Sequence, residues 1–149
     1  MRITLRELES KGAYQGQVDL FKELGLHKRK INLQDCLEHA GEIDWDWAAE
    51  NLLSDPARAE FNLVYDKAWA EYHRVCDSAW DEFNRVRDQA LDEFNRACAE
   101  DEFNRVCDLA GAEYGRVCDP AWNEFNRVQA STFFRLKESE QRAAPLEDK

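Results

Sequence analysis

The second half of the chain repeats an eleven-residue unit, and this periodicity constrains the fold more than any other feature. From Glu60 to Phe134 the units read EFNLVYDKAWA, EYHRVCDSAWD, EFNRVRDQALD, a shortened EFNRACAED, EFNRVCDLAGA, EYGRVCDPAWN and EFNRVQASTFF. Eleven residues at about 100° each make three helical turns plus about 20°, so equivalent positions stay on nearly one helix face. The repeat therefore predicts long α-helices over residues 57–97 and 102–137.

The apolar positions of the unit form a wide stripe on such a helix. Numbered from its Glu, the unit has an aromatic at position 2, Val at 5 and Ala at 9, which is a hendecad core spacing. Cys at position 6 and Trp at position 10 widen the stripe to an arc of about 140°. Contact with a single neighbouring helix requires a narrower apolar arc. Each helix is therefore expected to contact two neighbours, in a folded-back bundle or across an oligomer interface. The side chains expected to pack between helices are Phe61, Trp69, Tyr72, Trp80, Phe83, Phe94, Phe103, Tyr114, Trp122 and Phe125.

Two interruptions of the repeat predict where the helices end. The shortened unit spans nine residues, about 2.5 helical turns, which would place Phe94 and Phe103 on opposite faces of one straight helix. We therefore expect a break near residues 98–101 that folds the two arms into an antiparallel pair. Asp119 and Pro120 have the N-cap and N1 chemistry of a helix start, so a kink or restart is expected near residue 120.

The segment before the repeat, residues 1–54, reads as short helices separated by glycines. Three N-cap residues precede apolar helical patterns, namely Thr4, Asn32 and Asp44. Besides a first helix after Thr4, helices are expected over residues 15–24, 33–40 and 45–53. The predicted fold class is all-α: a small multi-helix head over 1–54, amphipathic hendecad helices over 55–137 and a flexible tail over 138–149.

Charge narrows the classes of function. The formal net charge of −11 argues against direct binding of nucleic acid and of anionic membranes, because both need an excess of Lys and Arg. No stretch approaches the roughly 18 consecutive apolar residues of a membrane span, and the first residues lack the apolar core of a signal peptide. A cytoplasmic location is therefore expected.

Few residues suggest chemistry of their own. Cys76, Cys98, Cys107 and Cys118 all occupy position 6 at the edge of the apolar stripe, where cysteine packs as a small hydrophobe. Cys36 and His39 have the spacing of half a zinc site, but no second half-site is evident in the sequence. Catalytic motifs and phosphate-binding glycine loops are missing from the sequence, so we expect a protein without enzymatic activity, metal or cofactor.

The units EFNRV and EYHRV, with DPAW or DSAW between them, resemble a group of small phage and prophage proteins. The C-terminal halves of that group carry tandem eleven-residue units of the A-x-x-EY-x-RV type. Residues 3–25, ITLRELESKGAYQGQVDLFKELG, resemble the head segment of the same group. The resemblance covers most of the chain and implies a phage context, with the bacterial cytoplasm as location, but it brings no biochemical role.

Two functions remain open at this point. The first is a non-enzymatic acidic interaction module that binds a host protein, such as a phage-encoded, anti-CRISPR-like inhibitor of a nucleic-acid-binding complex. The acidic residues expected to contact that partner are Glu82, Asp88, Glu93, Glu100, Asp101, Glu102 and Asp108. The second is a structural or assembly protein, in which the wide apolar stripe drives a homo-oligomeric bundle or spacer.

Charge density limits the first hypothesis. Residues 60–134 carry 16 acidic side chains. This is about one per 7 Å of helix, against about one phosphate per 1.7 Å of duplex DNA. DNA mimicry is therefore expected only locally, around residues 100–102. A lipid-surface helix is disfavoured, because the polar face lacks the Lys and Arg excess that binds anionic lipid.

Overall fold

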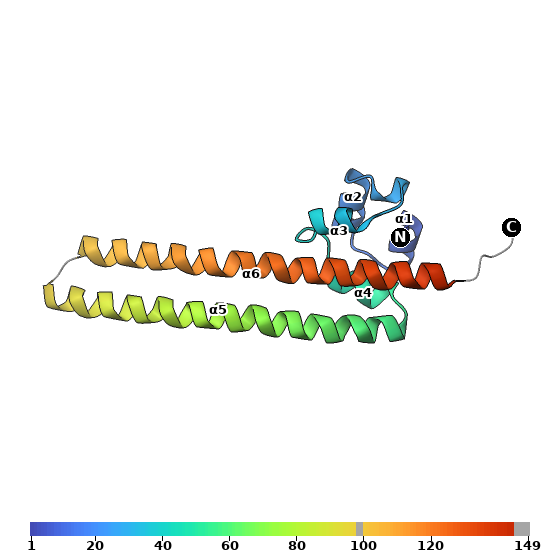
Figure 1. The fold of residues 1–149 in the computed structure, drawn as a ribbon. Coiled ribbons are helices and arrows are strands. Elements are labelled where there is room, and N and C mark those ends of the chain that lie inside the picture. The colour runs from blue at the N-terminus through green and yellow to red at the C-terminus, as the bar shows by residue number, and fades with distance from the viewer. Residues whose placement is uncertain (98–99, 145–149) are drawn as a thin grey trace. The chain divides into compact units, whose positions relative to one another are not determined.

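The computed structural model describes residues 1–97 and 100–144, and this part of the chain is all-α, without a strand (Figure 1). Short helices are followed by two long ones. The elements are α1 Leu5–Ser10, α2 Gln15–Glu23, the 3-10 helix η1 Leu26–Lys28, α3 Leu33–Glu38, α4 Trp45–Leu52, α5 Asp55–Ala97 and α6 Glu100–Ala143. The predicted all-α class, with a multi-helix head and two long helices, is confirmed.

The short helices begin at the caps that the sequence predicts. The Thr4 hydroxyl accepts a hydrogen bond from the main-chain N–H of Glu7 at 3.1 Å, and the Asp44 carboxylate accepts one from Trp47 at 2.9 Å. Asn32 starts α3 through a reciprocal capping box with Asp35. Each cap satisfies main-chain N–H groups that the first helical turn leaves unpaired.

The long helices separate where the shortened unit predicts a break. α5 ends at Ala97 and α6 begins at Glu100. Residues 98–99, and with them Cys98, lie outside the described residues. Phe94 and Phe103 contact each other from the two helices, with ring centroids 5.8 Å apart. α5 and α6 run antiparallel and side by side (Figure 1), which confirms the predicted antiparallel pair.

The helix does not restart near residue 120, because α6 continues through Pro120, and the kink expected there stays a prediction. A proline inside a helix costs about 3 kcal/mol or more, since it lacks an N–H and its ring crowds the preceding turn. Cys118 and Phe125, on either side of Pro120, are buried, and the Phe125 ring packs 5.2 Å from Trp69 of α5. Packing against α5 thus stabilises the helix on both sides of the proline.

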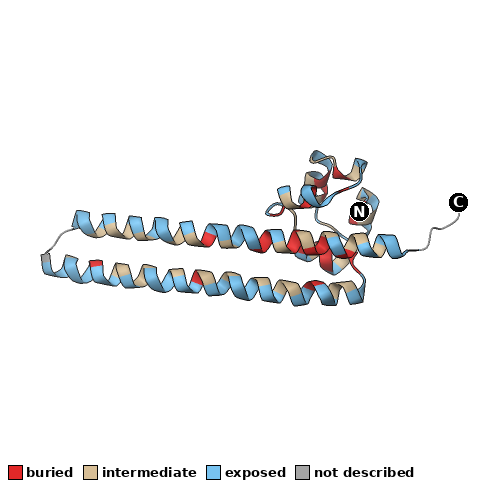
Figure 2. Ribbon diagram, viewed as in Figure 1, coloured by how far each residue is buried: buried red, intermediate tan, exposed pale blue. Residues whose placement is uncertain are grey.

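The chain divides into two compact units that do not coincide with the predicted boundary after residue 54. Unit 1 contains residues 1–66 and the chain from residue 126 onward, and unit 2 contains residues 67–125. Both long helices pass through both units. The core of unit 1 combines the head helices with Phe61 of α5 and with Ala130, Phe133 and Leu136 of α6 (Figure 2). The hydrophobic core of the head is therefore complete only when residues of the repeat helices are included.

The flexible tail expected over residues 138–149 is wrong for its first part, because α6 continues to Ala143. Glu140 accepts a hydrogen bond from the main-chain N–H of Ser54 at 2.8 Å. The Gln141 amide pairs with both main-chain groups of Arg2, at 2.8 and 2.6 Å. These polar side chains bind main-chain groups of unit 1 and so extend the helix. Residues 145–149 lie outside the described part of the chain.

Removing the Phe133 side chain tests the assignment of the α6 end to the core of unit 1. Phe133 is 0% exposed and lies 5.5 Å from the Trp45 ring, so Phe133→Ala should lower the free energy of unfolding by about 3–5 kcal/mol. Urea denaturation followed by circular dichroism measures this change. Leu63→Ala is the control: Leu63 is 64% exposed, and its substitution should change stability by about 0.5 kcal/mol or less. Equal effects of the two substitutions would contradict the assignment.

Candidate functional site

In unit 2 the repeat packs against itself along one antiparallel seam. The rings of Tyr72 and Trp122 lie 5.3 Å apart, and those of Trp80 and Tyr114 lie 5.7 Å apart. In repeat numbering these pairs join position 2 to position 10, and position 10 to position 2. Phe83 and Tyr114 extend the contact, with centroids at 6.4 Å. The seam is therefore symmetric, because position 2 of each long helix contacts position 10 of the other.

The centre of the seam is a pair of thiols at position 6. Cys76 and Cys118 are both buried and unoxidised. Burial, together with the hydrogen bond between the two thiols, raises the pKa of Cys76. A hydrogen bond to Cys118 is the main cause that raises the pKa of Tyr114 to about 12. The raised pKa values keep the Cys76 thiol and the Tyr114 phenol neutral near pH 7, which suits a packing role better than nucleophilic chemistry.

The seam uses positions 2, 6 and 10, whereas the sequence analysis places the core at 2, 5 and 9. Both sets have hendecad spacing, and both lie within the wide apolar stripe. At about 100° per residue, positions 5 and 9 fall on one side of the seam, and positions 3, 7 and 11 fall on the other. Val at 5 and Ala at 9 are left beside the seam on the same face of the helix pair.

These residues line an open groove along that face, with a volume of about 620 Å³. Its apolar lining consists of Val75, Ala79, Val86, Val106, Leu109, Ala110 and Val117. Phe83 and Tyr114 of the seam also border it, so the groove is continuous with the packed interior of unit 2. Leu109 is 59% exposed. We call this feature the Val/Ala groove.

The rims of the Val/Ala groove carry ion pairs of both signs. Positions 1 and 4 flank it, and in four units Arg at position 4 pairs with Glu at position 1 of the same unit. The Arg74–Glu71 pair, at 2.6 Å, is typical. The hydrogen bond from arginine lowers the pKa of each glutamate. The rim charges therefore balance, although the whole chain is acidic.

The opposite face of the helix pair is acidic. Its positions 7 and 11 place six exposed carboxylates there: Asp77, Asp81, Asp88, Asp92, Asp108 and Asp119. Asp88 pairs with its neighbour Arg87 at 3.0 Å, and no ion pair joins any of the other five to a described residue. We call this surface the aspartate face.

The structure does not gather the acidic residues expected to bind a partner into one patch. Glu82 lines the Val/Ala groove and pairs with Arg85, whereas Asp88 and Asp108 belong to the aspartate face. Glu93 is exposed near the end of α5. The last three, Glu100, Asp101 and Glu102, form the first turn of α6. Carboxylates there are stabilised by the helix dipole, so their clustering has a local structural cause.

The aromatic residues expected to pack between helices lie in two places. Phe61 is 1% exposed in the core of unit 1. The other nine make ring contacts: Trp69, Tyr72, Trp80, Phe83, Phe94, Phe103, Tyr114, Trp122 and Phe125. Sequence analysis did not single out the Val and Ala residues of the groove as a site. The signal for them was the width of the apolar stripe, which exceeds what one seam requires.

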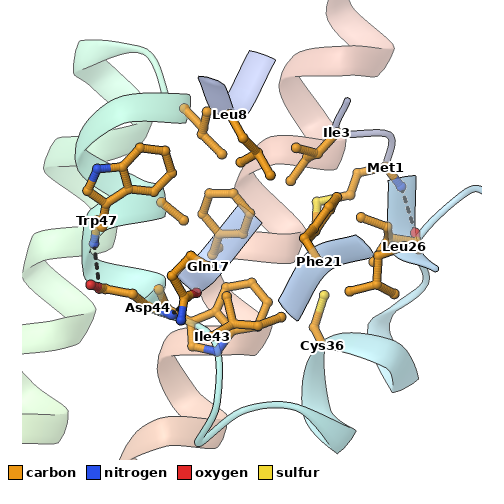
Figure 3. A pocket seen from close by; sticks show the side chains of 15 residues that line it. Met1, Ile3, Leu8, Gln17, Phe21, Leu26, Cys36, Ile43, Asp44 and Trp47 are labelled. Atoms are coloured by element: carbon orange, nitrogen blue, oxygen red, sulfur yellow. Dashed lines mark hydrogen bonds between the residues drawn. The ribbon is translucent and has the colours of Figure 1, made fainter. Parts of the chain in front are cut away.

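Unit 1 contains a second cavity, enclosed among Met1, Leu8, Phe21, Cys36 and Trp47 (Figure 3). Its volume is about 30 Å³, close to that of a single water molecule. Burial raises the pKa of Cys36 there to about 12, which keeps its thiol neutral. This cavity is a packing gap in the core and too small for an organic ligand.

The residues that the structure describes contain no group of three or more His, Cys, Asp and Glu arranged to hold a metal ion. Within the same residues, no helix has the length and apolarity needed to cross a membrane. A comparison with protein-family models, curated proteins and solved structures gave no match. The Val/Ala groove and the aspartate face are the two surfaces that the repeat forms in unit 2.

Mild oxidation tests the seam register directly. Because Cys76 and Cys118 face each other within hydrogen-bonding contact, treatment with diamide should join them by a disulfide within one chain. Peptide mapping under non-reducing conditions would identify the linked peptides. Cys76→Ser should abolish this product without creating another, and a dominant link from Cys107 to either residue would show that the register is wrong.

Proposed function

We propose that the chain is a non-enzymatic protein–protein interaction module that binds through the Val/Ala groove. The observation that carries this proposal is an apolar groove of about 620 Å³ along two rigid helices, bordered by charge-balanced rims. Grooves of this kind accept the apolar face of an amphipathic helix, with flanking polar groups that set orientation. The paired helices supply a preorganised surface, which reduces the entropic cost of binding.

The energetics of burial support this reading. Each Val or Leu side chain moved fully out of water contributes about 1.5–3 kcal/mol. Val75, Val86, Val106 and Val117 are only half-buried, and Leu109 is more exposed still. A partner that covers them would remove the remaining exposed surface of each side chain from water, and this burial opposes the loss of translational and rotational freedom on association.

A second candidate function uses the aspartate face. Its carboxylates are segregated from the groove and could contact a basic surface, such as that of a host nucleic-acid-binding protein inhibited by a phage protein in the bacterial cytoplasm. Along α5 the acids Asp77, Asp81, Asp88 and Asp92 stand four to seven residues apart. This spacing is about 6–10 Å, which is wider than the phosphate spacing of DNA. The aspartate face therefore has a lower charge density than DNA, and it could imitate only a short stretch of phosphates.

A matched pair of substitutions tests the proposed function. Ala110 lines the groove, whereas Ala112 is exposed at position 11 on the opposite side of α6. The bait is the tagged chain, and the bacterial lysate is supplemented with untagged chain. The Ala110→Glu bait should capture at least about 90% less partner protein than the wild-type bait, because the substitution would bury a carboxylate in an apolar contact. Ala112→Glu should retain that protein, as measured by quantitative mass spectrometry.

Addition of duplex DNA separates the two candidates. A partner of the groove should persist when DNA is added, whereas a basic partner of the aspartate face should be displaced by it. Equal capture by wild type, Ala110→Glu and Ala112→Glu, or no capture by any of them, would contradict binding through the groove.

A further inference from the structure

We propose that the partner in the Val/Ala groove is the same groove of a second copy of this chain, so that two α5–α6 pairs form a four-helix bundle. This inference rests on the proposed function, because it names the partner of that site. Support comes from the packing of the repeat against itself, the continuity of the groove with the seam, the area of the face and the distribution of charge.

The repeat already packs against itself within one chain. α5 and α6 contain the same unit, and in the seam position 6 meets position 6 while positions 2 and 10 exchange partners. Packing between copies of this unit is therefore already present in the fold. The groove offers a second apolar surface of the same unit, built from positions 5 and 9, which both helices present on one face.

The groove is continuous with the seam. Phe83 and Tyr114 belong to the seam and border the groove, so a second layer would extend an existing core. Ala79 and Ala110 are small, which allows a close approach of the facing helices. A helix that packs a neighbour on each of two adjacent faces is the arrangement found in four-helix bundles.

The groove supplies part of the area that a dimer needs. Its lining on α6 runs from Val106 to Val117, about 18 Å at 1.5 Å per residue, and a layer of two helices is about 20 Å wide, so the groove region offers about 360 Å². Each partner of a standard stable interface contributes about 800 Å². The rest of the interface would come from the turns of α5 and α6 that continue the same face beyond the groove.

The distribution of charge also favours contact through this face. Two copies of a chain with a net charge of −11 repel each other unless they approach through a neutral surface. The groove rims meet this condition, because their four Glu–Arg pairs balance. Packing groove against groove also places the two aspartate faces on opposite outer sides of the bundle, where water and salt screen them.

Sedimentation equilibrium of the purified full-length chain tests this inference. The wild-type protein should show a mass twice that of the 17.4 kDa chain, and Ala112→Glu should match it. Ala110→Glu should raise the dissociation constant of the dimer by about 100-fold or more, because it places an unpaired carboxylate in the new core. Circular dichroism verifies that both variants keep the helical content of the wild type.

A wild-type chain that stays monomeric at every accessible concentration would overturn the inference. So would a dimer that persists in Ala110→Glu, since the copies would then meet at another surface. If Ala110→Glu fails to fold, Leu109→Lys replaces it, because that side chain is already 59% exposed and its substitution spares the monomer. A monomeric chain that captures a host protein only when the groove is intact would leave the proposed function standing while refuting the second copy as partner.

Discussion

The packing of one eleven-residue unit against copies of itself is the interaction on which the rest of this structure depends. Positions 2, 6 and 10 of α5 meet the same positions of α6, with aromatic rings on either side of the buried Cys76 and Cys118 pair. Aromatic rings at positions 2 and 10 contact each other across the seam, which favours it over the alternative set of positions 2, 5 and 9, although Trp80 and Trp122 stay 49% and 44% exposed. Packing at positions 2, 6 and 10 then determines on which face of the helix pair each of the other repeat positions lies.

One consequence is that the helix pair has two chemically different faces. Val at 5 and Ala at 9 form the Val/Ala groove, whereas Asp at 7 and 11 forms the aspartate face. An apolar stripe of about 140° is wider than one neighbour can cover, so a two-helix layer leaves part of it in water. Few residues of unit 2 are buried (Figure 2), which fits a layer that is completed by a partner.

Much of this fold could be predicted because its signals are local. The caps at Thr4, Asn32 and Asp44, the long helices and the break near residue 98 all follow from patterns within a few turns of chain. Long-range contacts could not be read in this way. The pairing of Gln141 with Arg2 joins residues 139 positions apart and turns an expected tail into helix, and packing on both sides of Pro120 outweighs the local helix-breaking signal. Similarly, composition reveals acidic residues but not the side of the helix pair on which each one lies.

The repeat forms two apolar surfaces. One is covered by the other long helix of the same chain, and in the proposed dimer the second is covered by the same groove of a second copy. The most direct test of this arrangement is the solvent exposure of the methyl groups of Val75, Val86, Val106 and Val117, measured by NMR with a soluble nitroxide at low and at high protein concentration. We expect strong attenuation of these signals in the dilute protein and protection at high concentration. Attenuation that is equal at both concentrations would contradict the second copy as the partner of the groove.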